Sequence, residues 1–151
     1  LYHFETKEVL YAATVEEGFQ GLSKAAERGF MRGTSFDERL SCVVDELLNF
    51  AGEHRPLVRI ITREIVDPTE QRGEIHARLG ALADALVTFL KTDGEGRIRK
   101  DIPLREAVLQ LMTGYLVRES SREGSALWDE ADPTPALARA LLLRGEPKAG
   151  R

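Results

Sequence analysis

The side chains best suited to bind a metal ion are few in this chain and lie far apart. Its three histidines, His3, His54 and His76, form no pair at the i, i+4 spacing that places two ligands on one helix face. The single cysteine, Cys42, offers no set of thiolates for a structural zinc site. We therefore expect no metal site and no bound cofactor, and we interpret Cys42 as a small buried hydrophobe.

The acidic pairs do not have the arrangement of catalytic carboxylates either. Their members are adjacent in sequence, and adjacent residues of a helix point in different directions; the pairs are Glu16/Glu17, Asp45/Glu46 and Asp129/Glu130. The sequence contains no Gly-x-Ser-x-Gly elbow, no phosphate-binding loop and no His-Glu-x-x-His motif. We expect that the protein is not an enzyme, and we keep an all-helical enzyme only as a third reading.

The first ten residues, Leu-Tyr-His-Phe-Glu-Thr-Lys-Glu-Val-Leu, form the most informative string of the chain. Tyr2, Phe4, Lys7 and Leu10, with Thr6 in the small polar position before the lysine, resemble the end of the helix-turn-helix of the tetracycline-repressor (TetR) family. Two later segments also resemble that family, in the expected order. They are Gly-Arg-Ile-Arg-Lys-Asp-Ile-Pro at 96–103 and Leu-Leu-Leu-Arg-Gly at 141–145.

The resemblance implies two parts in the chain. Residues 1–7 would be the C-terminal remnant of the helix-turn-helix DNA-binding domain, and residues 8–151 the ligand-binding and dimerisation domain. Tyr2, His3 and Lys7 would contact the backbone phosphates of operator double-stranded DNA, contacts that position a protein without reading its sequence. Most of the helix-turn-helix, including its base-reading residues, would precede residue 1.

The composition is that of one ordinary globular domain. The chain has 151 residues and a net charge of −4, whereas a domain that binds DNA by itself usually has a basic patch. It contains no apolar run of about 18 residues and no signal-peptide pattern at its start, so we expect no membrane span. The single cysteine fits a reducing compartment, and we expect a cytoplasmic protein.

Apolar residues recur at helical spacing along the whole chain, and no segment alternates long enough for a strand. Thr6 and Ser35 are placed to cap two helices, the second through the capping box Ser-Phe-Asp-Glu. We predict an all-α protein, a helical bundle like the ligand-binding and dimerisation domain of TetR-like regulators. Gly18 and Gly21 would let its first helix bend. The expected helices cover residues 7–27, 36–51, 57–66, 72–92, 104–118 and 135–144.

The last two expected helices have more apolar surface than one partner can cover. The helix over 104–118 carries two apolar stripes, and the helix over 135–144 is apolar almost all round. We predict that both helices pack against a second copy of the chain as a four-helix bundle, giving a homodimer. The expected interface residues are Leu104, Val108, Leu111, Gly114, Tyr115, Leu137 and Leu141.

The first five expected helices would enclose an effector pocket, as the resemblance implies. Small-molecule sites are mostly apolar with a few polar groups. The candidate lining residues are Phe19, Phe50, Ile61, Glu64, Phe89, Met112 and Tyr115. An inward Glu64 would indicate a cationic or hydroxylated ligand, because buried carboxylates are rare unless they have a partner.

These expectations lead to a ligand-responsive DNA-binding transcriptional regulator, with repression as the default of the family. An unknown small molecule would bind the helical domain and release operator DNA. The alternative is a helical dimerisation or adaptor module without a small-molecule ligand. An enclosed apolar cavity between the first four helices is the observation that would favour the regulator over the adaptor.

Overall fold

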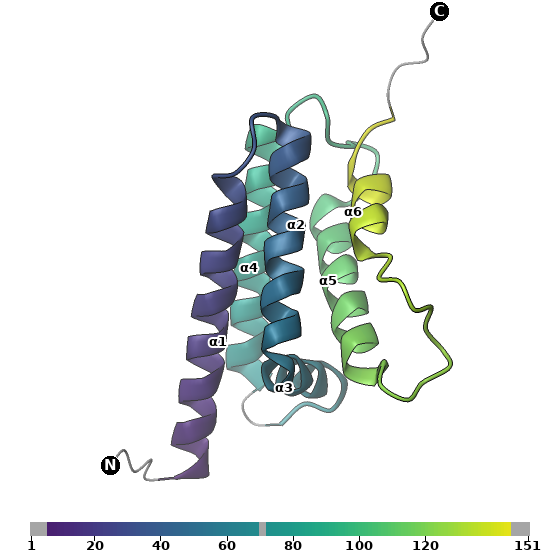
Figure 1. The fold of residues 1–151 in the computed structure, drawn as a ribbon. Coiled ribbons are helices and arrows are strands. Elements are labelled where there is room, and N and C mark those ends of the chain that lie inside the picture. Colours follow the sequence, from purple (N-terminus) through teal and green to yellow (C-terminus); the bar gives the residue numbers. More distant parts are fainter. Residues whose placement is uncertain (1–5, 70–71, 146–151) are drawn as a thin grey trace, which may run out of the picture.

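The computed structural model describes residues 6–69 and 72–145 and shows an all-helical fold (Figure 1). No strand occurs in these two ranges, which contain a single isolated β-bridge. None of the described helices is long and apolar enough to cross a membrane. The helices are α1 (Lys7–Phe30), α2 (Phe36–Glu53), α3 (Arg55–Val66), α4 (Arg72–Asp93), α5 (Leu104–Ser121) and α6 (Thr134–Leu142).

Two of the helix starts follow the capping residues that the sequence offered. The hydroxyl of Thr6 accepts a hydrogen bond from the backbone N–H of Val9 at 3.1 Å, and α1 begins at the next residue. The hydroxyl of Ser35 accepts one from the N–H of Glu38 at 3.2 Å, and the Glu38 carboxylate accepts another from the N–H of Thr34 at 2.7 Å. Both predicted caps are therefore confirmed.

The glycines of α1 lie where the helix contacts its neighbours most closely. A Cβ on Gly21 would lie 2.3 Å from the ring of Phe50, and one on Gly29 would lie 2.4 Å from the Cα of Val43. The helix runs without interruption from Lys7 to Phe30. These glycines thus allow α2 to approach α1.

Helices α1, α2 and α4 lie side by side, and α3 crosses their lower end in the view of Figure 1. Helix α5 packs against α3 and α4, and the short α6 packs on α5 and α2. The N-terminal end of α1 therefore lies at the same end of the molecule as α3. This arrangement leaves one side of α5 and α6 at the surface.

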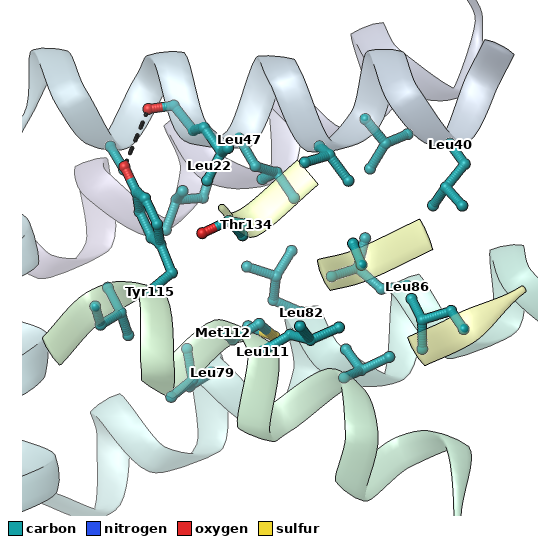
Figure 2. Close-up of a pocket in the computed structure, with 18 of the residues that line it drawn as sticks. Leu22, Leu40, Leu47, Leu79, Leu82, Leu86, Leu111, Met112, Tyr115 and Thr134 are labelled. Carbon is teal, nitrogen blue, oxygen red and sulfur yellow. Dashed lines mark hydrogen bonds between the residues drawn. The ribbon is translucent and has the colours of Figure 1, made fainter. Parts of the chain in front are cut away.

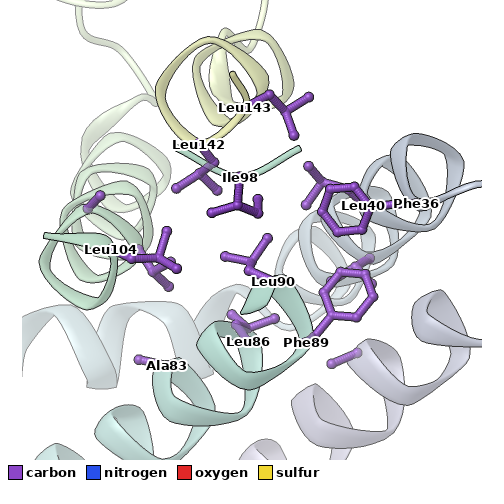
Figure 3. Packing of buried hydrophobic residues seen from close by; sticks show 14 of the residues in the cluster. Phe36, Leu40, Ala83, Leu86, Phe89, Leu90, Ile98, Leu104, Leu142 and Leu143 are labelled. Carbon is purple, nitrogen blue, oxygen red and sulfur yellow. The ribbon is translucent and has the colours of Figure 1, made fainter. Parts of the chain in front are cut away.

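The buried side chains form two clusters, which we name the upper core and the lower core after their places in Figure 1. The upper core joins α2, α4, α5 and α6, and the rings of Phe36 and Phe89 meet there at 5.5 Å between centroids (Figure 3). The lower core joins α1, α3, α4 and α5 around Val15, Ile61 and Ile75, all at most 1% exposed.

The β-bridge joins two segments that are far apart in sequence, pairing Ile98 with Leu143 in antiparallel fashion. The N–H of Arg99 donates to the carbonyl of Leu142 at 2.9 Å, and the N–H of Arg144 donates to the carbonyl of Arg97 at 2.7 Å. Helix α6 ends at Leu142, two residues before the predicted end, because the backbone becomes extended at Leu143 to make this pair. The two later family-like segments therefore lie against each other.

Candidate functional site

An apolar pocket of about 140 Å³ lies at the centre of the bundle, between α2, α4, α5 and α6 (Figure 2). All six helices contribute to its wall, with α1 and α3 supplying one residue each. The lining residues are Leu22, Leu40, Val43, Val44, Leu47, Leu48, Ala51, Ile61, Leu79, Leu82, Leu86, Phe89, Leu90, Val108, Leu111, Met112, Tyr115, Leu116, Thr134, Ala138 and Leu142.

Helical periodicity explains why these side chains face the same space. The α2 contributors Leu40, Val43, Val44 and Leu47 recur at three and four residues, so they lie on one face of the helix. The α6 contributors are spaced by four, at Thr134, Ala138 and Leu142. The small side chain of Ala138 leaves room for the pocket, because a larger residue at this position would extend into it.

Space of this size is unusual inside a small protein. Native interiors are packed as densely as organic crystals, and most of their voids are no larger than a water molecule. The apolar lining and central position of this space make it the candidate binding site.

Two lining side chains of the described pocket carry an oxygen atom, Tyr115 and Thr134, and none is charged. The hydroxyl of Tyr115 donates a hydrogen bond to the main-chain carbonyl of Leu48 at 3.4 Å, the dashed line in Figure 2. Burial, with the nearby carboxylates of Glu119 and Asp132, raises the pKa of Tyr115 to about 12. The wall therefore presents a neutral phenol at physiological pH.

Four of the seven side chains expected in an effector pocket lie in this wall. They are Ile61 of α3, Phe89 of α4, and Met112 and Tyr115 of α5. The other three lie elsewhere. Phe19 is buried in the lower core and reaches the outer groove between α1 and α4. Phe50 packs against Gly21 and stacks on His54, with 3.9 Å between the two ring centroids.

Glu64 is buried, at 2% exposed, but its carboxylate does not line the pocket. It accepts hydrogen bonds from the N–H and hydroxyl of Thr69, at 3.0 and 2.7 Å, and from the hydroxyl of Tyr11 at 3.2 Å. Burial raises the pKa of Glu64, but the bonds from Thr69 and Tyr11 outweigh it, so the pKa lies below its ordinary value. The carboxylate thus joins α1 to the segment after α3, and it gives no indication of a cationic ligand.

The residues expected at a dimer interface divide into three groups. Leu104 and Val108 are buried within the single chain, where Val108 lines the pocket. Leu111, Tyr115 and Leu141 are half-buried. Gly114 and Leu137 are exposed, with Leu137 at 52%. A second copy could therefore reach only part of the expected set without rearrangement of the core.

The structure describes one of the three residues expected to contact DNA. Tyr2 and His3 lie outside the described residues, and Lys7 is exposed at the start of α1. Within residues 6–69 and 72–145, no three His, Cys, Asp or Glu side chains are grouped so that they could hold a metal ion. Cys42 is half-buried.

Sequence reasoning missed the part that α6 plays in the pocket, because an apolar helix near the end of the chain was assigned to a dimer. The spacing of Thr134, Ala138 and Leu142 by four residues was a usable signal for a face directed into the chain's own core. It also missed Tyr11 as the partner of Glu64. No local signal could have found that pair, since the two residues are 53 positions apart.

Comparisons with known proteins found no match to this chain among protein-family models, curated proteins or solved structures.

Proposed function

We propose that the protein is a ligand-responsive transcriptional regulator of the TetR type, acting in the cytoplasm, in which a small effector bound in the central pocket releases operator DNA. The observation that carries the proposal is the apolar pocket shared by all six helices. An adaptor module without a small-molecule ligand needs no such pocket. The resemblance of residues 1–10 to the end of a helix-turn-helix supports DNA as the output.

Helix α1 is the element suited to connect the pocket with DNA. It starts within the helix-turn-helix-like string of residues 1–10, lines the pocket through Leu22, and is held at its lower end by Tyr11. In a dimer, a small displacement of α1 would alter the spacing of two DNA-binding units that must match half-sites about one DNA turn apart. An effector acts in this way only if it binds one position of α1 better than the other.

The decisive experiment is an electrophoretic mobility shift with the full-length gene product and its own promoter DNA. Specific binding at low salt that a small molecule then abolishes is the expected result, because the effector would favour the spacing that does not fit the operator. Absence of binding at low salt would exclude the regulator. Binding that no pocket ligand affects would leave a DNA-binding protein without the proposed response.

We also propose that the regulator is a homodimer formed by the exposed sides of α5 and α6. Gly114, Val117 and Leu137 lie at this surface, and a Cβ added to Gly114 would meet nothing within 4 Å. An open glycine in the middle of a helix allows the backbone of a second helix to approach closely. The face therefore suits a copy of itself across a two-fold axis.

Sedimentation velocity with two charge variants tests the dimer. Leu137→Glu should convert a dimer to a folded monomer, because it would bury a charge in the interface. Val66→Glu is the matched control, since Val66 is also exposed, at 70%, but lies at the end of α3. This variant should remain dimeric. A wild-type protein that sediments as a well-folded monomer at micromolar concentration would contradict the proposal.

A further inference from the structure

The central pocket has the size of one small ring and a wall without charge. Its volume of about 140 Å³ is close to that of an apolar cavity in another protein, about 150 Å³, which stays dry and binds benzene. A charged ligand would lose its hydration there and find no described lining side chain of opposite charge. Size and polarity together therefore select compact, uncharged molecules.

The charged residues nearest to Tyr115 along α5 already have partners. Arg118 is 4% exposed and donates from Nη2 to the carbonyls of Asp129 and Ala131, at 2.6 and 3.1 Å. Its Nη1 lies 3.9 Å from the carboxylate of Asp132. This Nη1 makes no hydrogen bond within the described residues, but Arg118 does not line the pocket, so its charge is not offered to a ligand there.

Of the two oxygen-bearing side chains in the wall, Thr134 donates its hydroxyl to the carboxylate of Asp132 at 2.7 Å. The other anchor is the pair formed by the Tyr115 hydroxyl and the Leu48 carbonyl. Their distance of 3.4 Å is long for a bond between two oxygens, which usually measures about 2.7–2.8 Å. Breaking such a weak hydrogen bond costs little free energy when a ligand replaces it with shorter ones. A ligand hydroxyl placed beside the pair can accept from Tyr115 and donate to Leu48, so that no polar group stays unsatisfied.

We propose that the pocket binds a compact, uncharged ligand of about one ring that carries a single hydroxyl group, which Tyr115 and Leu48 recognise. As an account of the effector this rests on the proposed function, whereas binding itself can be measured on the chain alone. Phenol, toluene and benzoate are suitable probes. Each probe has one six-membered ring. Phenol carries a hydroxyl, toluene a methyl group and benzoate a negatively charged carboxylate.

Calorimetric titration of the chain with the three probes tests the proposal. Phenol and toluene should bind and benzoate should not. Tyr115→Phe should weaken phenol about two- to tenfold, the effect of one hydrogen bond, and leave toluene within about twofold. Benzoate binding as tightly as phenol, no binding of phenol or toluene, or equal weakening of phenol and toluene by Tyr115→Phe would each overturn the proposal.

A second pair of variants locates the site. Ala138→Leu adds three carbons to the pocket wall and should abolish binding of phenol and toluene, because the larger side chain occupies the space that they need. Ala136→Leu makes the same change on the exposed side of α6 and should leave binding unchanged. Equal phenol affinity in the Ala138→Leu variant and the wild type would overturn the proposal.

The results also separate this proposal from the regulator itself. If phenol binds as expected but no pocket ligand affects the mobility shift of the full-length protein, the regulator fails and the binding site stands. If a charged molecule releases DNA and competes with neither phenol nor toluene, the regulator stands and this ligand class is wrong.

Discussion

Two tyrosines of this chain share a raised pKa but have different kinds of partner. Burial, assisted in one case by Glu64, raises the pKa of both Tyr11 and Tyr115 to about 12. Tyr11 donates to a buried carboxylate that has two further hydrogen bonds from Thr69, whereas Tyr115 makes one long bond beside an empty pocket. The first arrangement holds the fold together, and the second leaves a hydroxyl ready for a ligand.

The substitution with the largest expected effect on stability is the one that removes the Glu64 carboxylate. Glu64→Ala would leave the donors of Thr69 and Tyr11 without their acceptor and open a small void. At about 1–3 kcal/mol for each unsatisfied buried group, we expect a loss of roughly 3 kcal/mol and a fall in Tm of about 6–12 °C. Thermal denaturation measures it, with Glu95→Ala, at an exposed turn, as control. Equal Tm values in the two variants would show that the Glu64 network does not hold the fold.

A smaller effect follows from pH, because the folded protein holds the pKa of Glu64 below its unfolded value of 4.5. The stability that the carboxylate provides is complete above about pH 4.5 and is lost as the pH falls through the lower folded pKa. We expect Glu64→Gln to be less stable than the wild type at neutral pH, with a difference that narrows in acid. Urea unfolding across this range measures it, and a difference independent of pH would contradict the pKa argument.

Tyr11→Phe should have a more modest effect. It removes one hydrogen bond of 3.2 Å from Glu64, and the two bonds from Thr69 remain. We expect a loss of about 1 kcal/mol, or about 2–4 °C in Tm. The loss should disappear when Tyr11→Phe is made in the Glu64→Ala background, which has no acceptor, if both changes act on the same contact. Additive losses would mean that Tyr11 stabilises α1 by packing alone.

Tyr115→Phe should change stability least. Its bond to Leu48 is long, and the backbone carbonyl of Leu48 also belongs to a helix. We expect a change within about 0.5 kcal/mol, as for most substitutions that break no tight contact. Thermal denaturation of this variant beside Tyr11→Phe makes the comparison directly. A larger loss of stability for Tyr115→Phe than for Tyr11→Phe would mean that the Tyr115 hydroxyl, and not the Tyr11 hydroxyl, stabilises the fold.

The helices could be predicted because their signals are local. Thr6 and Ser35 cap helices through bonds that span three residues, and apolar periodicity covers each helix. The pocket was only partly predictable, since a side chain such as Phe50 can pack on a neighbouring glycine or line a cavity with the same periodicity. The Glu64–Tyr11 bond depends on how α1 meets α3. No sequence pattern predicts a contact between these two residues, which are 53 positions apart.

The bridge between Ile98 and Leu143 has a consequence for proteolysis. Arg118 also binds the backbone of Asp129 and Ala131, just before α6, so α6 is fixed at both ends independently of the loop over residues 122–128. That loop is largely exposed, with Leu127 at 75%, and exposed loops are the usual sites of cleavage. A protease cut there should therefore give two fragments on a denaturing gel but a single species on gel filtration.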